Sequence, residues 1–297
     1  MKVLELEGVF RSHKLGIPVL SGVDLALEPG EVVGLVGENG AGKTTLIKVA
    51  LGTLVAQRGK VRLFDCDPRE HPVEVKRRLG YVSEDQVLPP YLRVDQVLEL
   101  HRSLYASWDD GLARELCGRF ALDGRERIRK LSKGQARRVA VVCAVAHRPE
   151  LLLLDEPAGG FDPAARREVL DAVLQLLSEA GTAILFSSHH MQDLERTAGR
   201  VVLLHRGKIL FDRELDLLRE QTTLVVLSAG NGLTPFHLRS VQGCLGSRVV
   251  ADELRAVFAG VPAEVRARLL PLTKAEVPTC ATLSLEDLMV EILGDRG

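Results

Sequence analysis

Apolar and polar residues change their spacing several times along the N-terminal part of the chain. Residues 3–6 and 19–27 alternate apolar and polar side chains, which is typical of strands with one buried face. Residues 32–36 form a short, continuous apolar run, as in strands of a parallel sheet that is covered on both faces. A glycine-rich stretch separates this run from a helical pattern at residues 44–51. We therefore predict an antiparallel layer, followed by a buried strand, a loop and a helix.

Helical spacing dominates the middle of the chain. Val94, Val97, Leu98 and His101 fall on one face of a predicted helix, and mostly polar and charged residues fill the positions between them. We expect a helical subdomain over about residues 73–147.

Helices and strands then alternate. The predicted elements are a helix at 135–146, a strand at 151–154, a helix at 164–180, a strand at 183–186, a helix at 191–198 and a strand at 201–204. Such alternation indicates a parallel sheet that is covered by helices.

The pattern changes again near Glu220. A strand-like run at residues 223–227 leads into glycine-rich turns, and an amphipathic helix is predicted at residues 285–293. We expect a first domain over residues 1–219 and a small accessory domain over residues 220–297, which is too short to repeat the first.

The composition is that of an ordinary globular protein, with 46% hydrophobic and 27% charged residues. The formal net charge of −1 gives no general attraction to nucleic acid, so no such partner is expected. The longest clean apolar run, residues 139–146, is shorter than a bilayer span, and Glu5 and Glu7 stand where a secretory signal needs an apolar core. These features predict a cytosolic protein. Its five cysteines are scattered without a C-x-x-C pair, which indicates reduced thiols.

The glycine-rich stretch carries the clearest chemistry. In Gly37-Glu38-Asn39-Gly40-Ala41-Gly42-Lys43-Thr44, the glycines let backbone N–H groups point at phosphate oxygens beside the positive end of a helix. Lys43 is placed to reach the β and γ phosphates of a nucleotide, and Thr44 to bind Mg²⁺. The alternative is a turn that binds nothing, but the preceding strand and following helix favour a phosphate loop.

Two acids follow the apolar strand at residues 151–154. Asp155 is placed to hold Mg²⁺, and Glu156 to polarise the attacking water. Burying neighbouring carboxylates at the end of a strand is costly without a cation, so a purely structural pair is the weaker interpretation.

A third motif lies between these two. Leu131-Ser132-Lys133-Gly134-Gln135 precedes a helix, with Ser132 as the predicted N-cap and Gly134 allowing close backbone approach. The loop can therefore present a helix N-terminus to a phosphate, although a lone copy would be an ordinary helix cap. Together the three motifs resemble those of the ABC ATPases, over about residues 1–219.

The resemblance implies both a fold and a site. The fold class would be α/β: a P-loop NTPase core with a mainly parallel sheet, an antiparallel β subdomain, a helical subdomain and a small C-terminal α+β appendage. The cofactors would be ATP and Mg²⁺, and the partner a second copy, bound head to tail so that each signature loop completes the opposite site. The implied nucleotide-binding residues are Gly37, Asn39, Gly40, Gly42, Lys43, Thr44, Thr45, His13, Ser132, Gly134, Gln135 and Asp162. The implied catalytic residues are Glu156, His189 and Lys43, and the implied metal ligands are Thr44, Asp155 and Glu84.

Two of these positions have a second interpretation. His189 matches the switch histidine of the family by its spacing to Asp193-Leu194-Glu195, and His190 is the competing choice. Asp162 lies in a loop that resembles the one linking the two sites of the dimer, and it is also suited to cap the next helix; the two roles are compatible.

Two positions depart from the family. Glu84 stands where glutamine is common, with Gln86 shortly after it; a carboxylate can still ligate Mg²⁺ but adds negative charge. His13 occupies the position of the aromatic residue that stacks on adenine, and Phe10 is the nearby aromatic. Adenine rather than guanine follows from the family and from the lack of an N-K-x-D sequence.

The resemblance implies a peripheral ATPase in the cytoplasm that drives a separate transmembrane permease from the inner face of the cell membrane. In such ATPases the helical insertion receives a helix of the membrane subunit. The stretch Leu283-Ser284-Leu285-Glu286-Asp287-Leu288-Met289 resembles the end of ATPases from drug and antibiotic exporters, which favours export of a drug, antibiotic or lipid-like substrate. Otherwise it is simply an amphipathic helix that closes a small domain.

Two other classes remain open. One is a soluble ABC-type ATPase acting on nucleic acid or ribosomes, supported only by a basic stretch that lacks interleaved aromatic residues and is otherwise a solvated face. This stretch consists of Arg125, Arg127, Arg129, Lys130, Lys133, Arg137 and Arg138. The other class is an ATP-dependent sensor or immunity component with little turnover.

Overall fold

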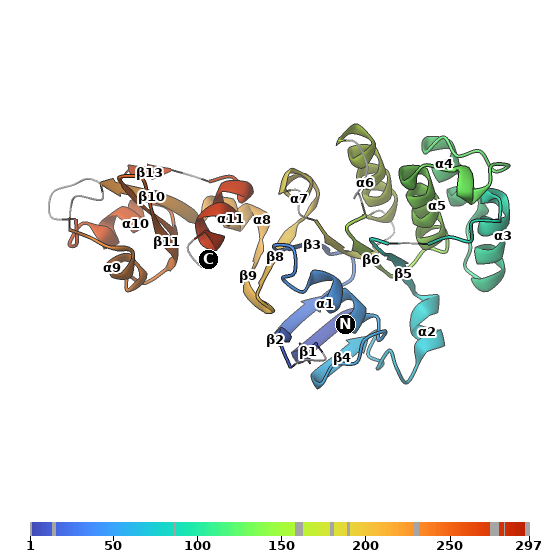
Figure 1. Cartoon of the computed structure of the whole chain (residues 1–297), viewed down its shortest axis with the longest axis horizontal. Coiled ribbons are helices and arrows are strands. Elements are labelled where there is room, and N and C mark those ends of the chain that lie inside the picture. The colour runs from blue at the N-terminus through green and yellow to red at the C-terminus, as the bar shows by residue number, and fades with distance from the viewer. Residues whose placement is uncertain are drawn as a thin grey trace. The chain divides into compact units, whose positions relative to one another are not determined.

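The structure is a computed structural model that describes residues 2–13, 16–85, 87–157, 163–178, 181–188, 191–228, 232–273, 279–281 and 283–294. The chain divides into two units, Met1–Asp212 and Arg213–Gly297, and each has its own hydrophobic core. The boundary expected after residue 219 falls inside α8 (Leu215–Glu220), which belongs to the second unit. Figure 1 labels most of the elements of both units.

An antiparallel sheet opens the first unit, as predicted. It consists of β1 (Leu4–Ser12), β2 (Pro18–Leu27) and β4 (Arg58–Leu63), in the order β2-β1-β4 (Figure 1). Leu4 and Leu6 on one face of β1 are buried. β4 was not predicted, because charged residues and a glycine fill most of its positions and hide the alternation.

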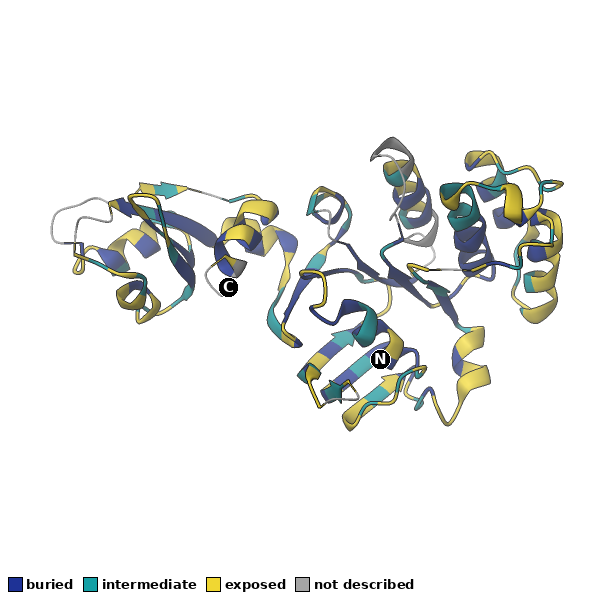
Figure 2. Ribbon diagram, viewed as in Figure 1, coloured by how far each residue is buried: buried dark blue, intermediate teal, exposed yellow. Residues whose placement is uncertain are grey.

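The central sheet carries the parallel strands that the alternating pattern predicts. Its strands are β3 (Val32–Val36), β5 (Leu79–Val82), β6 (Leu151–Asp155), β7 (Ala183–Ser187), β8 (Arg200–His205) and β9 (Lys208–Glu214), in the order β5-β6-β7-β3-β8-β9. From β5 to β8 in this order, neighbouring strands run parallel. Figure 2 shows these strands buried along most of their length, as expected for continuous apolar runs with both faces covered.

Helices join the two sheets and cover the central one. α1 (Lys43–Ala50) packs between the sheets, in contact with β2, β4 and β6 (Figure 1). The other helices described in this unit are α2 (Pro72–Arg77), α3 (Val94–Leu104), α4 (Asp110–Arg119), the short 3₁₀ helix η1 (Ile128–Lys130), α5 (Lys133–Val145), α6 (Pro163–Ser178) and α7 (Met191–Thr197). One continuous core therefore links β1, α1 and the strands of the central sheet.

The region expected to be helical, residues 73–147, contains a strand as well. α3 follows the prediction, with Val94 and Val97 buried on one face. β5, however, pairs with β6 in the central sheet. It was not predicted, because a strand of only four residues is too short to be distinguished from a helix by the spacing of its apolar residues. Gly80 in β5 permits close packing: a Cβ there would lie 2.3 Å from the carbonyl oxygen of Ala144 in α5.

The second unit is a small α+β domain. After α8 its elements are β10 (Thr222–Ser228), α9 (Pro235–Arg239), β11 (Cys244–Val250), β12 (Glu253–Ala259), α10 (Pro262–Leu269), β13 (Thr279–Ala281) and α11 (Leu285–Leu293). The sheet is antiparallel, in the order β11-β12-β10-β13. From β10 to β13 this is the β-α-β-β-α-β arrangement of ferredoxin-like domains. β10 and α11 were predicted, whereas charged residues and a glycine interrupt the apolar pattern of β11 and β12.

The last helix, α11, packs on β11 and β12. Leu285 and Leu288 are among its buried apolar residues. The carboxylate of Glu291, which is also buried, accepts from Nε of Arg248 at 2.8 Å and lies 3.1 Å from Nη2 of Arg255. A buried carboxylate is tolerated only with such partners, so this cluster fixes the position of α11 on the sheet.

The cysteines and the lengths of the helices complete the description of the fold. All five cysteines are free thiols, as the scattered spacing predicted. Within the part of the chain that the structure describes, none of the helices combines the length and apolarity needed to cross a bilayer.

Candidate active site

The glycine-rich loop connects the end of β3 to the start of α1, as the sequence predicts. Gly42 has a φ of +110°, and a Cβ on it would lie 2.8 Å from the carbonyl oxygen of Val19, so this position requires glycine. α1 then begins at Lys43 without a side-chain cap, and the residues of its first turn line a pocket. A helix N-terminus of this kind is suited to an anion.

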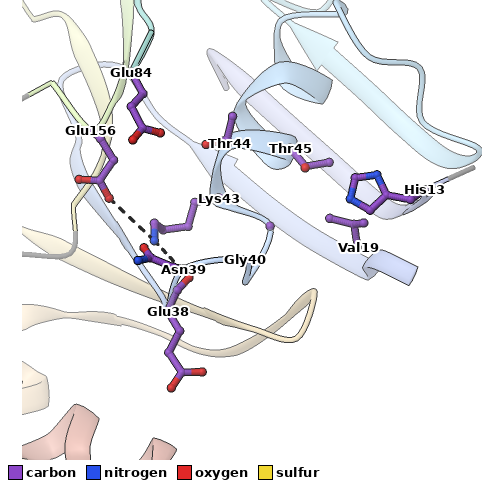
Figure 3. A pocket seen from close by; sticks show the side chains of 11 residues that line it. His13, Val19, Glu38, Asn39, Gly40, Lys43, Thr44, Thr45, Glu84 and Glu156 are labelled. Atoms are coloured by element: carbon purple, nitrogen blue, oxygen red, sulfur yellow. Dashed lines mark hydrogen bonds and ion pairs between the residues drawn. The ribbon is translucent and has the colours of Figure 1, made fainter. Parts of the chain in front are cut away.

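Lys43 lies at the centre of this loop, and its side chain is only 7% exposed. Its Nζ donates to the carbonyl oxygen of Gly37 at 2.6 Å and to that of Glu38 at 3.3 Å. The same atom lies 3.8 Å from Oε1 of Glu156 (Figure 3). The two carbonyls and the Glu156 carboxylate therefore hold the ammonium group at the pocket, and a phosphate can replace or supplement them as its partner.

Asp155 ends β6 and is 1% exposed. Its Oδ1 accepts from the hydroxyl of Thr44 at 3.2 Å and from that of Ser187 at 2.9 Å. Its Oδ2 is buried and has no hydrogen-bond partner among the residues that the structure describes. A buried carboxylate oxygen without a partner is costly unless a cation completes it. This oxygen, together with the hydroxyl of Thr44, fits the hard oxygen ligands that Mg²⁺ prefers.

Glu156 follows directly and has a left-handed backbone, with a φ of +48°. Its N–H donates to the hydroxyl of Ser187 at 2.9 Å, and its carbonyl accepts from Nη1 of Arg137 at 3.1 Å. A non-glycine residue in this region is strained by about 1–3 kcal/mol and persists where its surroundings hold it. The strained backbone directs the side chain into the pocket, toward Lys43 (Figure 3).

These groups surround a cavity of about 430 Å³. Its lining residues are His13, Val19, Glu38, Asn39, Gly40, Gly42, Lys43, Thr44, Thr45, Glu84 and Glu156 (Figure 3). The structure thus brings together most of the residues expected to hold the nucleotide. Gly37 and Asp155 contact this group through Lys43 and Thr44. His13 and Val19 lie at one end of the cavity, with Glu84 and Glu156 at the other (Figure 3).

The third motif, residues 131–135, does not line this cavity. Ser132, Gly134 and Gln135 begin α5 and are not among the residues lining this cavity. Ser132 is the N-cap, as predicted, and accepts from the N–H of Gln135 at 3.1 Å, while Oε1 of Gln135 accepts from the N–H of Ser132 at 2.9 Å. The side chain of Ser132 is exposed and is thus accessible to another molecule.

Some expected site residues fall outside the described residues. They are Gln86, Asp162, His189 and His190.

Ser187 and Arg137 contact the acids of the site, and Tyr81 lies near Asp155, but none of the three was assigned to the site from the sequence. Burial, with the nearby charge of Asp155 as a second cause, raises the pKa of Tyr81 to about 12, so its phenol stays protonated. Arg137 appeared only as part of a basic stretch, whereas in the structure it donates to the carbonyl of Glu156. A residue pattern gives no sign of these contacts, because they join segments that are distant in the sequence.

Comparison with known proteins places this site in a family. Residues 20–159 match the model of the family described as ABC transporter. The chain is 32% identical over 206 residues to the ABC transporter ATP-binding protein YtrB of Bacillus subtilis, covering 69% of this chain and 70% of that protein. It is 33% identical to the daunorubicin resistance ATP-binding protein DrrA3 of Streptomyces coeruleorubidus, over 68% of this chain and 66% of that protein. It is also 33% identical to the phosphonates import ATP-binding protein PhnC of Alcaligenes faecalis, over 71% of this chain and 82% of that protein.

Solved structures agree with this placement. The ATP-binding subunit of an ABC transporter aligns with a TM-score of 0.67 and 29% identity, over 73% of this chain and 92% of that chain. A dimeric ATP-binding cassette in a post-hydrolysis state with ADP and phosphate shares the fold, with a TM-score of 0.65 and 24% identity over 71% of this chain and 98% of that chain. The chain therefore belongs to the ABC transporter family, and its first unit is the ATPase cassette of that family.

Proposed function

We propose that this protein binds ATP with Mg²⁺ in the cavity above Lys43 and hydrolyses it in order to drive a separate membrane permease. The observation that carries the proposal is the buried Oδ2 of Asp155, which lacks a hydrogen-bond partner in the described structure, beside a phosphate loop. A carboxylate in this state suits a site that is completed by a cation and a phosphate chain.

Each residue of the cavity has a role in this proposal. Lys43 binds the β and γ phosphates, and Thr44, Asp155 and Glu84 hold the metal, which supplies charge neutralisation when it is bound. Glu156 orients and deprotonates the attacking water. His189 contacts the γ phosphate, Asp162 links the two sites, and His13 stacks on the base.

Hydrolysis further requires a second copy of the chain. Ser132, Gly134 and Gln135 lie at an exposed helix start, away from the described lining of their own cavity. We propose that they close over the nucleotide of the partner, as head-to-tail pairing provides. Donors on all sides of the γ phosphate would then stabilise the charge that develops there.

Phosphate release from purified protein tests the enzymatic part. Glu156→Gln should reduce turnover by about 100-fold or more while ATP still binds, because it removes the general base. Lys43→Met should weaken ATP binding, whereas Lys48→Met, which changes an exposed lysine on the same helix, should not. Unchanged turnover in Glu156→Gln would refute the assignment.

We further propose that the permease holds the protein at the inner face of the membrane and that the transported substrate is exported. Support comes from the tail that begins at Leu283 and from the similarity to a daunorubicin resistance protein. The similarity to a phosphonate import protein supports the opposite direction. Inside-out vesicles that contain the permease and this protein decide between them: ATP-dependent accumulation of substrate inside the vesicles means export, and ATP-dependent loss from preloaded vesicles means import.

A further inference from the structure

Two adjacent arginines of α5 point to different surroundings. Arg138 donates to the carbonyl of Phe120 at 3.1 Å and to Oε2 of Glu168 at 3.1 Å, and these contacts lie away from the cavity. Arg137 instead contacts two residues that line the cavity. Its Nη1 donates to the carbonyl of Glu156 at 3.1 Å, and its Nη2 donates to the carbonyl of Glu84.

The two acceptors of Arg137 belong to different loops. Glu84 follows β5 and Glu156 follows β6, and the side chains of both line the nucleotide cavity. One planar guanidinium group therefore contacts two loops that are 72 residues apart in the sequence (156 minus 84). A lysine in this position has a single ammonium group and cannot reproduce the fork.

The contact with Glu156 bears on its strained backbone. Ser187 accepts from the N–H of Glu156 at 2.9 Å, and Arg137 donates to its carbonyl at 3.1 Å. The residue with a φ of +48° is thus held on both sides. Removing the donor at the carbonyl frees this residue to relax toward a more common backbone conformation, which would carry the carboxylate away from its position in the cavity.

Charge supports the same role. The guanidinium lies close enough to the carboxylates of Glu84, Asp85, Glu156 and Asp155 to interact with each of them electrostatically. A fixed cation at this place offsets their repulsion for a polyphosphate. It also belongs to α5, the helix that Ser132 caps, so the signature loop and the donor to the Glu156 carbonyl lie on one helix.

We propose that Arg137 is a positioning residue for hydrolysis, which sets Glu156 and the Glu84 loop relative to α5. Movement of α5, when its signature loop seats on the nucleotide of a second copy, would then shift Glu156 within its own site. The inference rests on the proposed hydrolysis and adds a means by which the two sites of a dimer influence each other.

The test compares Arg137→Gln and Arg137→Lys with Arg129→Gln, which removes the same charge from an exposed arginine of the basic stretch. Turnover, ATP affinity and thermal unfolding are measured for each. We expect Arg137→Gln to lower kcat by roughly 10- to 100-fold, the scale of a catalytic group that is slightly misplaced, with ATP affinity within about threefold of wild type. Arg137→Lys should recover part of kcat, and Arg129→Gln should match wild type.

A second arm asks whether Arg137 acts through Glu156. In single-turnover hydrolysis of radiolabelled ATP, adding Arg137→Gln to Glu156→Gln should cost little beyond Glu156→Gln alone. A full additional loss in the double variant would overturn the inference, as would a kcat for Arg137→Gln within about twofold of wild type. If the glutamine variant does not fold, Arg137→Lys decides: a folded lysine variant with wild-type kcat overturns the inference. If the wild-type protein shows no ATP hydrolysis that is lost in Glu156→Gln, that result refutes the proposed function itself.

Discussion

The hydroxyl of Thr44 donates to Oδ1 of Asp155 at 3.2 Å, although the two residues are 111 positions apart in the chain. Thr44 lies in the first turn of the helix that follows β3, and Asp155 is the last residue of β6. Both strands belong to one parallel sheet, so their carboxyl ends meet at the same edge. This contact links the phosphate loop to the carboxylate that we propose as a Mg²⁺ ligand.

We expect Asp155→Asn to abolish stabilisation by Mg²⁺. The amide keeps the size of the side chain but removes the charge that the cation requires. With ATP present, adding Mg²⁺ should raise the thermal unfolding midpoint of wild type, since a ligand at about 100 times its Kd contributes about 2.7 kcal/mol, and should leave that of the variant unchanged. Asp216→Asn, at a side chain that is 90% exposed, is the control and should respond as wild type does. An undiminished Mg²⁺ response in Asp155→Asn would exclude this carboxylate as a ligand.

Two substitutions at Ser132 separate its capping role from its proposed role between copies. Ser132→Ala removes the helix cap and should cost about 1 kcal/mol of folding stability, while leaving room for a partner nucleotide. Ser132→Arg should in addition prevent ATP-dependent dimerisation, because its bulk fills the space that a phosphate would occupy. Sedimentation velocity with ATP, in the Glu156→Gln background that limits turnover, distinguishes the two variants. A dimer of the arginine variant that forms with ATP would contradict the head-to-tail arrangement.

His147 predicts a pH dependence of stability. It is 1% exposed, its ring stacks on Tyr105 with centroids 4.0 Å apart, and its Nε2 donates to the carbonyl of Leu79 at 3.2 Å. Burial is the largest cause that lowers its pKa below the ordinary 6.5, and His101 lowers it further. The folded protein therefore keeps His147 neutral where the unfolded chain binds a proton.

The sign of this effect follows from proton binding. Because the unfolded state takes up the extra proton, the free energy of unfolding falls as the pH drops below 6.5 toward the lowered pKa. His147→Gln can retain the donor but cannot titrate, so its unfolding midpoint should change less than that of wild type between about pH 7.5 and about pH 5.5. Equal pH dependence in wild type and His147→Gln would show that another group is responsible.

Gly80 and Gly118 should respond to alanine in opposite directions. A Cβ at Gly80 would lie 2.3 Å from the carbonyl oxygen of Ala144 and 2.7 Å from Cδ1 of Leu152, so Gly80→Ala must separate β5 from α5. We expect a loss of about 1–3 kcal/mol in the free energy of unfolding. A Cβ at Gly118, near the end of α4, meets no heavy atom within 4 Å, and Gly118→Ala should stabilise by about 0.5–1 kcal/mol. Chemical denaturation measures both, and equal effects would contradict the packing at Gly80.

The elements that were predicted from the sequence are those whose burial is visible in the pattern of their own residues. Residues 32–36 and 151–154 are continuous apolar runs, as expected for strands with both faces buried, and such a run is visible within the segment itself. β4 and β11 were missed because their positions in a sheet depend on the strands beside them, and their own residues include charges and glycines.

The same distinction applies to the site. Lys43, Thr44, Asp155 and Glu156 lie in short local motifs, and the structure places them together as the motifs imply. The role of Arg137 depends on where the ends of β5 and β6 lie relative to α5, which no local pattern records.

The cluster of Glu291 with Arg248 and Arg255 limits how the second unit can be shortened. A chain cut before Leu285 would leave two guanidinium groups on an uncovered apolar sheet without their carboxylate. Such a fragment would aggregate through that surface, and its failure would be easily mistaken for loss of a binding partner. Deletion experiments on this unit should therefore remove it before Arg213 or retain α11.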